Sequence, residues 1–393
     1  MPARIEAMIK AELLVWARKD AGYSAQIAAN KLKISIEKLE KWESGELRPT
    51  IAQLRNIAVL YKRPLSVFYL PRPPKSFQPL RDFRRFPDQK GMPLSPGLIY
   101  EIRLARERRE IALELFNALK EAPPSVRFNI DMNRNPEIVA KNIRESTNIP
   151  LSEQRAWRGY HAAFAAWRRS LEAAGILVFQ APKISTQEMR GFSLPQSVLP
   201  VIVVNSGDWI GGRIFSLIHE FVHILKNEGG LCDLSVSGNR SLSEQHTEVF
   251  CNHVAGAYLV PAEDLLNENI VQKNSPSLVW DDRDIWSLAR KFKVSREVIL
   301  RRLLILNRTT NDFYQAKREE YLAEIRPPKK PKELRIPIHI KVLARTGRSY
   351  ARLILASFNQ DKITSSEVSS YLGLKLNYIP KLEAEISQPE ASY

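Results

Sequence analysis

Cysteine is scarce in this chain of 393 residues, and several signatures of other protein classes are missing. The sequence has two cysteines, Cys232 and Cys251, so it offers no disulfide framework, and we expect a protein of the reducing cytoplasm. No apolar run approaches the length of a membrane span, and the charged first segment is unlike a signal peptide. There is also no P-loop, no dinucleotide-binding fingerprint and no fixed-period repeat.

Charge is abundant but unevenly placed. The formal net charge is +16, of which residues 1–75 contribute +7 and residues 76–200 contribute +6, whereas residues 201–310 sum to −1. A basic amino-terminal segment next to a near-neutral centre fits a flanking module that contacts nucleic acid. Ordinary solvated surface charge would give the same total, so charge alone does not decide between the two.

The most informative motif is HEFVH, which runs from His219 to His223. On a helix, residues i and i+4 share one face, so both imidazoles can bind one metal ion while Glu220 reaches a water molecule beside it. Apolar residues recur at helical spacing from 213 to 227, after a β-branched run over 198–205 that predicts a strand. We expect the glycine pair at 211–212 to end that strand, and the pair at 229–230 to end the helix.

Two histidines do not complete a catalytic zinc site, which usually has a third protein ligand. The stretch 241–261 predicts a second helix, with Ser241 and Glu244 as a capping box and Pro261 as its end. Within it, spacing alone leaves four candidate ligands: Glu244, His246, Glu248 and His253. Asn252 shares a stripe with Glu248 and could support a ligand, whereas Cys251 fits the core.

The segment from Arg190 to Pro261 resembles the ImmA/IrrE family of metallopeptidases. The matching elements are RGFSL, PVIVVN, RIFSLIHEFVHIL and EVFCNHVAGAYLVP, the last of which fits the family pattern E-x-x-[AC]-N-x-x-A. The resemblance implies that His219, His223 and Glu248 bind the metal and that Glu220 is the catalytic base. Val222 stands where many members have glycine. For His246 and His253, the fit to the family pattern favours surface or supporting roles over metal ligation.

The amino-terminal segment predicts four short helices. The first is expected from Ala3 to Lys19, and Ser24 can cap the second, AQIAANKL. A tight turn at residues 33–34 separates it from a third helix capped by Ser35, and Thr50 with Gln53 forms a capping box for the fourth. The string from Lys41 to Leu70 resembles the Xre/lambda-repressor-like helix-turn-helix domain.

That resemblance makes residues 35–42 a recognition helix with Glu37, Lys38 and Lys41 pointing outward. Lysines suit guanine or phosphate, and Glu37 could accept from cytosine N4, although acidic side chains repel phosphate. One such module covers a half-site, so sequence-specific binding to double-stranded DNA would need a homodimer. The alternative is a four-helix module that binds protein.

The remaining segments predict further helices and linkers. Prolines mark linkers near 71–97 and 325–337, and helices are expected over 98–122 and 155–174, before a strand at 176–180. Residues 285–307 predict a helix, a turn and a helix capped by Ser295. There, Arg296, Arg301 and Arg302 could meet DNA, or the pair could pack against the metal-binding domain. Thr364 with Glu367 begins a last helical unit.

We therefore expect an α+β, mainly helical fold, with a zincin-like metallopeptidase domain preceded by an all-α helix-turn-helix domain. The predicted domains are a helix-turn-helix domain at 1–72, a proline-rich linker at 73–97, the peptidase domain at 98–310 and a helical extension at 311–393. The resemblance implies a zinc peptidase, with manganese as an alternative metal, that cleaves a transcriptional repressor to control a stress or mobile-element operon. The alternatives are a non-enzymatic regulator that uses the domain as a sensor, and an antitoxin-like regulator that holds a protein partner.

Overall fold

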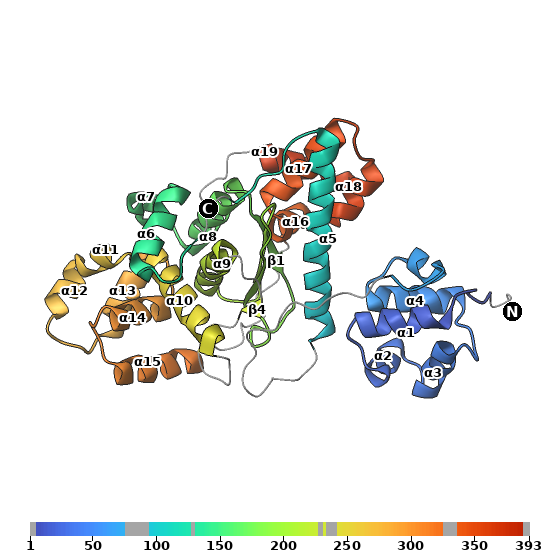
Figure 1. The fold of residues 1–393 in the computed structure, drawn as a ribbon, viewed down its shortest axis with the longest axis horizontal. Coiled ribbons are helices and arrows are strands. Elements are labelled where there is room, and N and C mark those ends of the chain that lie inside the picture. Colours follow the sequence, from blue (N-terminus) through green and yellow to red (C-terminus); the bar gives the residue numbers. More distant parts are fainter. Residues whose placement is uncertain are drawn as a thin grey trace. The chain divides into compact units, whose positions relative to one another are not determined.

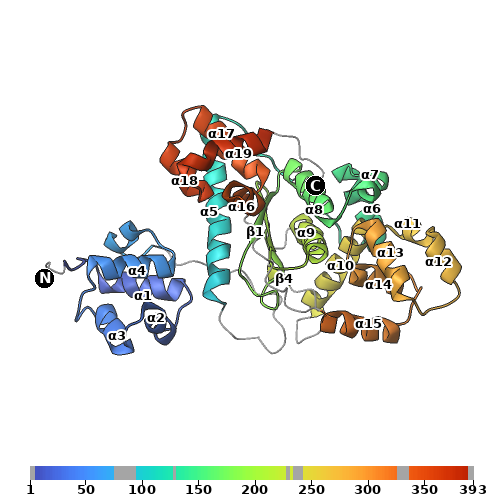
Figure 2. The same ribbon diagram turned by 180° about the vertical axis from the view of Figure 1, so that it is seen from behind.

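The computed structural model describes residues 5–74, 94–126, 130–226, 231–232, 242–324 and 336–387. The chain divides into two compact units, one of residues 1–80 and 89–104 and one of residues 81–88 and 105–393. As expected, the fold is α+β and mainly helical (Figures 1 and 2). Among the described residues, no helix combines the length and the apolar character that crossing a membrane requires.

The first unit is built from short capped helices: α1 (Ala11–Asp20), α2 (Ala25–Leu32), α3 (Ile36–Ser44), α4 (Ile51–Tyr61) and the 3₁₀ helix η1 (Leu65–Tyr69). The caps are those that the sequence predicts: Ser24 caps α2, Ser35 caps α3, and Thr50 with Gln53 forms the capping box of α4. Lys33 is left-handed, with φ of 57°, and makes the tight turn between α2 and α3. This region fits the helix-turn-helix arrangement.

The predicted first helix is wrong in its first half, because α1 begins only at Ala11. Backbone pairing holds the preceding segment against the residues before α4. The Ala7 amide donates to the Pro49 carbonyl at 2.9 Å, and the Ile51 amide donates to the Ile5 carbonyl at 3.1 Å. Ile5 is therefore 67% exposed instead of facing the core. The apolar spacing alone could not reveal this pairing with a distant segment.

The second unit contains a small sheet surrounded by helices. Its strands are β1 (Leu177–Ala181), β2 (Gly191–Leu194), β3 (Val201–Asn205) and β4 (Leu231–Cys232), in the order β1-β3-β2-β4. The β1–β3 pair is parallel, and β2 is antiparallel to both of its neighbours. The helices before and around the strands are α5 (Pro96–Leu119), which begins in the first unit, α6 (Pro136–Thr147), α7 (Leu151–Ala156), α8 (Tyr160–Ala173), α9 (Ile210–Leu225) and α10 (Leu242–Leu259).

Further helices follow along the chain: α11 (Ala262–Leu266), α12 (Asn269–Asn274), α13 (Asp282–Phe292), α14 (Arg296–Ile305), α15 (Asn311–Glu324), α16 (Ile338–Thr346), α17 (Arg348–Asn359), α18 (Ser365–Leu372), the 3₁₀ helix η3 (Leu376–Tyr378) and α19 (Ile379–Ser387). α15 packs against α14, whereas α16 packs against β1. The cap at Ser295 and the capping box of Thr364 with Glu367 are present as predicted.

Both faces of the sheet are covered, and every residue of β1 and β3 is buried. Val178, Ile202 and Val204 belong to the core that these strands share with α8, α9 and α10. On β1, Phe179 instead meets Tyr350 of α17 edge-on, with ring centroids 5.5 Å apart. Successive residues of a strand therefore pack against helices on opposite faces of the sheet. Because both faces are buried, this part of the sequence is a continuous apolar run.

Two expectations for this unit are wrong, and others concern residues that the structure does not describe. The helix expected over 155–174 is two helices, because the chain is extended at Gly159 and the ring of Trp157 packs against Trp167, with centroids 5.2 Å apart. The glycine pair at 211–212 lies inside α9 and does not end the strand. The glycines at 229–230, Ser241 and most of the 73–97 linker lie outside the described residues, as does the side chain of Glu244.

Candidate metal centre

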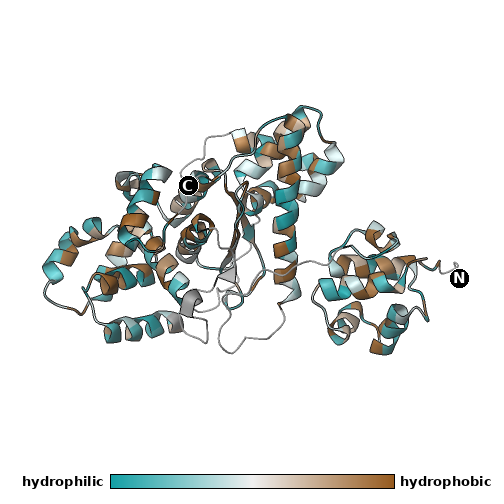
Figure 3. Ribbon diagram, in the orientation of Figure 1, coloured by the Kyte–Doolittle hydropathy of each residue, from teal (hydrophilic) through white to brown (hydrophobic). Residues whose placement is uncertain are grey.

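The start of α9 depends on two glycines that allow very close packing. A Cβ atom on Gly211 would lie 1.9 Å from the Trp209 ring, and one on Gly212 would lie 2.7 Å from the Asp208 carboxylate. Both glycines therefore let the β3–α9 connection fold back on the first turn of the helix. The rest of α9 is almost wholly buried and strongly hydrophobic (Figure 3). The sequence HEFVH thus lies on a rigid helix inside the domain.

The structure brings His219 and His223 of α9 together with Glu248 of α10. The two Nε2 atoms are 3.1 Å apart. Glu248 Oε2 lies 3.6 Å from His219 Nε2, and Glu248 Oε1 lies 3.4 Å from His223 Nε2. All three residues are buried, with exposed fractions of 2% or less. Among the described residues, this is the group whose ligand atoms converge closely enough to hold a metal ion.

These spacings fit a tetrahedral cation. Zinc–nitrogen and zinc–oxygen bonds of ~2.0–2.1 Å at tetrahedral angles place neighbouring ligand atoms roughly 3.3 Å apart. The three separations of 3.1, 3.4 and 3.6 Å bracket that value. Two imidazoles and one carboxylate also form a ligand set that suits zinc and leaves one position open. The residues present therefore fit a divalent metal ion of this size.

Glu220 is fully buried and lies beside β2. A Cβ atom added to Gly191 would lie 3.2 Å from Glu220 Cγ and 3.3 Å from Glu220 Oε1. Glycine at the first position of β2 is therefore what lets this carboxylate approach the strand. Since Glu220 follows His219 directly, the same helix turn fixes both the first candidate ligand and the carboxylate beside it.

Comparison with protein-family models agrees with this site. Residues 171–304 match the peptidase family described as the IrrE N-terminal-like domain. The matched segment runs from the end of α8 to α14, and it contains His219, Glu220, His223 and Glu248. The family is of the metallopeptidase type, so the likeness to ImmA/IrrE peptidases predicted from the motifs is confirmed.

No curated protein matches the chain. Among solved structures, one described as a Mycobacterium tuberculosis transcriptional regulator matches with 15% identity and a TM-score of 0.28. The match covers 50% of this chain and 51% of that one, so the chain spans about half the length of that regulator.

Two contacts hold together the two helices that carry the candidate ligands. Lys226, which follows the last residue of α9, donates from Nζ to Thr247 Oγ1 of α10 at 2.7 Å, one residue before Glu248. Deeper in the domain, Cys251 Sγ lies 3.8 Å from His223 Nδ1. Cys251 is fully buried, as the sequence suggests, but it also touches a candidate ligand, a contact that no sequence pattern indicates. Such a contact restrains the orientation of the imidazole ring.

The other polar residues of α10 are placed differently. His246 is exposed, and His253 pairs with Glu137 of α6 at 2.7 Å, so neither joins the cluster of ligand atoms. Asn252 is 4% exposed, yet its amide atoms make no hydrogen bond to the described residues. Its supporting role stays a prediction.

Glu137 forms a network that joins α6, α10 and α14. Arg302 of α14 donates two hydrogen bonds to its carboxylate, at 2.6 and 2.9 Å, and a third to the Val260 carbonyl at 2.9 Å. Burial raises the pKa of Glu137, but the hydrogen bonds from His253 and Arg302 outweigh it and lower the pKa from 4.5 to about 2. Gly256 leaves room for Arg302, because a Cβ there would lie 3.2 Å from Arg302 Cδ.

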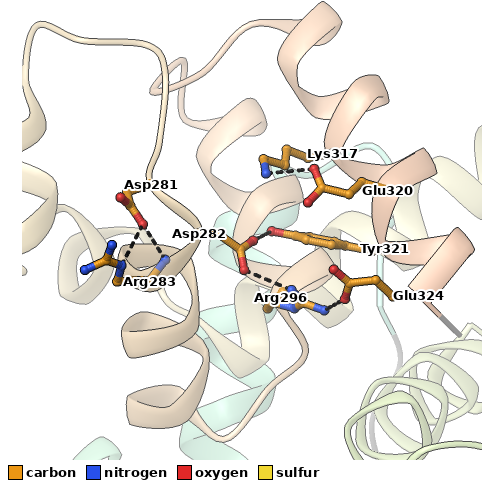
Figure 4. A network of polar contacts seen from close by, with 8 residues as sticks. All are labelled: Asp281, Asp282, Arg283, Arg296, Lys317, Glu320, Tyr321 and Glu324. Atoms are coloured by element: carbon orange, nitrogen blue, oxygen red, sulfur yellow. Dashed lines mark hydrogen bonds and ion pairs between the residues drawn. The ribbon is translucent and has the colours of Figure 1, made fainter.

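The arginines of α14 are committed to contacts within the domain. Arg302 has an exposed fraction of 0%, and Arg301 pairs with Glu297 at 3.1 Å. Arg296 bonds Asp282 at 3.0 Å and also pairs with Glu324 of α15 (Figure 4). These pairings favour the packing role of α13 and α14 over the alternative of DNA contact.

In the first unit, all three residues expected to contact DNA are exposed on α3. Lys41 pairs with Glu46 at 3.1 Å, and Lys38 lies over the Trp42 ring at 5.5 Å from its centroid. The hydrogen bonds at the amino end of α3, from the backbone and from Ser35, lower the pKa of Glu37. The helix itself is anchored to α1 by Glu43, which accepts two hydrogen bonds from Arg18 at 2.7 and 2.8 Å. The exposed residues thus lie on a fixed surface.

Proposed function

We propose that this protein is a zinc-dependent peptidase joined to a DNA-binding unit, and that it cleaves a transcriptional repressor to control a stress or mobile-element operon. The observation that carries the proposal is the convergence of His219, His223 and Glu248 at separations that suit a tetrahedral cation. The peptidase family matched by residues 171–304 supports the same conclusion.

In this proposal, each residue of the centre has a separate task. His219, His223 and Glu248 would hold the cation, zinc being favoured and manganese the alternative. When bound, the cation would polarise a peptide carbonyl as a Lewis acid and lower the pKa of a water molecule. Glu220 would take the proton from the attacking water and later deliver it to the leaving amine. Its position against Gly191 limits where that carboxylate can move.

The proposal is tested first by metal content. We expect about one zinc per chain in the purified full-length protein, with a sharp loss of affinity in Glu248→Ala, because removing one ligand leaves only two. His246→Ala is the matched control, since His246 lies on the same helix but outside the cluster. Full metal occupancy of Glu248→Ala in the presence of a competing chelator would contradict the ligand assignment.

The chemistry is tested separately with Glu220→Gln. This variant should keep its zinc and its fold but lose cleavage of repressor proteins encoded at its own locus, by on the order of a hundredfold or more, because a general base has been removed. If Glu220→Gln cleaves as fast as the wild type, the mechanism is wrong. If the wild type binds zinc and the repressor but cleaves nothing, the domain acts as a sensor or partner-binding module.

The first unit would direct the peptidase to DNA. Its net positive charge and the exposed Lys38 and Lys41 on a capped, anchored α3 support duplex binding, and a dimer would place two such helices on adjacent half-sites. We propose cytoplasmic action, in keeping with DNA and a repressor as partners. We also propose that the helix-turn-helix domain ends at residue 72, the linker at 97 and the peptidase domain at 310.

A further inference from the structure

A cavity of about 300 Å³ opens at the amino-terminal end of α9, between that helix and helices α13 to α15. Its walls are rich in aromatic rings: Tyr160, Trp209, Phe215, Trp286 and Tyr321. This volume is at the lower end of the ~300–1,000 Å³ typical of ligand pockets, so it suits one ring system and not an extended cofactor.

Two of these rings are only partly covered. Trp209 is 49% exposed and Trp286 is 39% exposed, although each is a large apolar side chain. The Trp209 ring already packs on Tyr160, with centroids 5.0 Å apart. Further aromatic surface entering the cavity would bury these indole faces and could stack against them, which is favourable beyond area alone.

The charged groups of the lining are paired within the protein. Arg190 lies 3.5 Å from Asp208, and Arg301 lies 3.1 Å from Glu297. Arg296 pairs with both Glu324 and Asp282, and the Tyr321 hydroxyl donates a hydrogen bond to Asp282, as Figure 4 shows. Three arginines and three carboxylates leave the lining without net charge. A charged group would therefore lose its hydration with no opposite charge available, whereas an uncharged ring would not.

The cavity adjoins the candidate metal centre at two points. Phe215, which lines it, stacks on His219 one turn further along α9, with ring centroids 6.0 Å apart and planes inclined by 29°. Arg190, also in the lining, directly precedes Gly191, the residue against which Glu220 lies. Phe215 thus contacts both the cavity and a candidate ligand, and Arg190 joins the lining to the strand that Glu220 approaches.

We propose that this cavity receives an uncharged aromatic side chain of the polypeptide held at the metal centre. This inference rests on the proposed peptidase function for the identity of that polypeptide. The cavity would select a substrate segment that carries phenylalanine, tyrosine or tryptophan close to the scissile bond. Trp209 and Trp286 would supply the apolar walls, and the paired charges around them would discourage lysine, arginine and acidic side chains.

Binding can be measured without catalysis. Full-length protein would be titrated with N-acetyl-phenylalaninamide, N-acetyl-leucinamide and N-acetyl-lysinamide by calorimetry and saturation-transfer NMR. We expect the aromatic amide to bind about tenfold more tightly than the other two, and Trp209→Ala and Trp286→Ala each to weaken it about tenfold. Tyr69→Ala is the control, because Tyr69 is 49% exposed but belongs to the first unit.

The melting temperature of each variant establishes that it is folded. Equal binding of the three amides, or unchanged binding in both folded tryptophan variants, would overturn the assignment of the cavity.

A peptide series separates this inference from the proposed function. Peptides that differ only in one residue, phenylalanine, leucine or lysine, would be offered to the wild type for cleavage and to Glu220→Gln for binding. We expect an aromatic preference in both assays that weakens in Trp286→Ala. Cleavage without any aromatic preference would refute the cavity assignment and leave the peptidase intact. Tight binding of the aromatic peptide without cleavage by the wild type would support the cavity assignment and contradict the proposed peptidase function.

Discussion

Replacing Glu137 by glutamine should destabilise the second unit, because the substitution leaves a buried guanidinium without its counter-charge. Arg302 is wholly buried and gives two of its three hydrogen bonds to this carboxylate. Removing one partner of a buried ion pair typically costs ~3–5 kcal/mol. The side chain of Glu137 is itself 28% exposed, so solvent screening reduces the expected cost to the lower limit of that range or below it, about 2–3 kcal/mol.

The lowered pKa of Glu137 gives a second value for this stabilisation and predicts the direction of its pH dependence. A change from 4.5 to about 2 corresponds to about 3 kcal/mol before screening, at 1.36 kcal/mol per pKa unit. Since the folded pKa is depressed, this stability is present above pH ~4.5 and is lost as the pH falls toward 2. The wild type should therefore lose about 2–3 kcal/mol in that window, and Glu137→Gln should lack that part of the pH dependence.

The assay is urea unfolding of the full-length chain, followed by tryptophan fluorescence at pH 7 and at several values between 5 and 2. Five of the seven tryptophans lie in the second unit, so the signal reports mainly on it. Glu145→Gln is the matched control, because Glu145 is exposed on the same helix. A Glu137→Gln protein within about 0.5 kcal/mol of the wild type, or a control with an equal loss, would refute the reasoning.

Three further predictions follow from individual contacts. Gly191→Ala should keep its zinc but lower cleavage about tenfold or more, because the new methyl group presses on Glu220; an unchanged rate measured beside metal content would contradict this. Lys38→Ala and Lys41→Ala should each weaken duplex binding by roughly 1–3 kcal/mol if they reach base edges, measured by fluorescence anisotropy against salt concentration, with the exposed Lys19→Ala as control. Thr50→Ala should destabilise the first unit by ~1 kcal/mol in thermal unfolding, since it removes the cap of α4, whereas the exposed Ser44→Ala should not.

Local signals in the sequence were sufficient for much of the secondary structure. Ser24, Ser35 and Thr50 mark helix starts because their side chains satisfy backbone amides that any helix leaves unpaired. The β-branched run before α9 reads as a strand because both faces of β3 are buried. These features depend on residues close together in the chain, so a local pattern can reveal them.

The predictions from sequence were wrong where contacts with a distant segment, or close packing around a glycine, determine the local structure. The residues before α1 pair with the chain before α4, and the glycines of α9 admit Trp209 and Asp208 where a strand end was expected. At the metal centre, spacing left four candidates for the third ligand, and only a family pattern selected Glu248. The pairing of Glu137 with His253 and Arg302 brings together residues more than a hundred positions apart, which no local pattern could indicate.

The ligand atoms of the candidate centre come from two helices that are remote in sequence, since His223 and Glu248 are 25 positions apart. A cation bound to all three would act as a cross-link that closes this loop of the chain in the native state alone. By mass action, it would stabilise the folded domain by about 4 kcal/mol at a free concentration a thousandfold above its dissociation constant. Metal supply would then set how long the protein survives unfolding and proteolysis, as well as whether it can act.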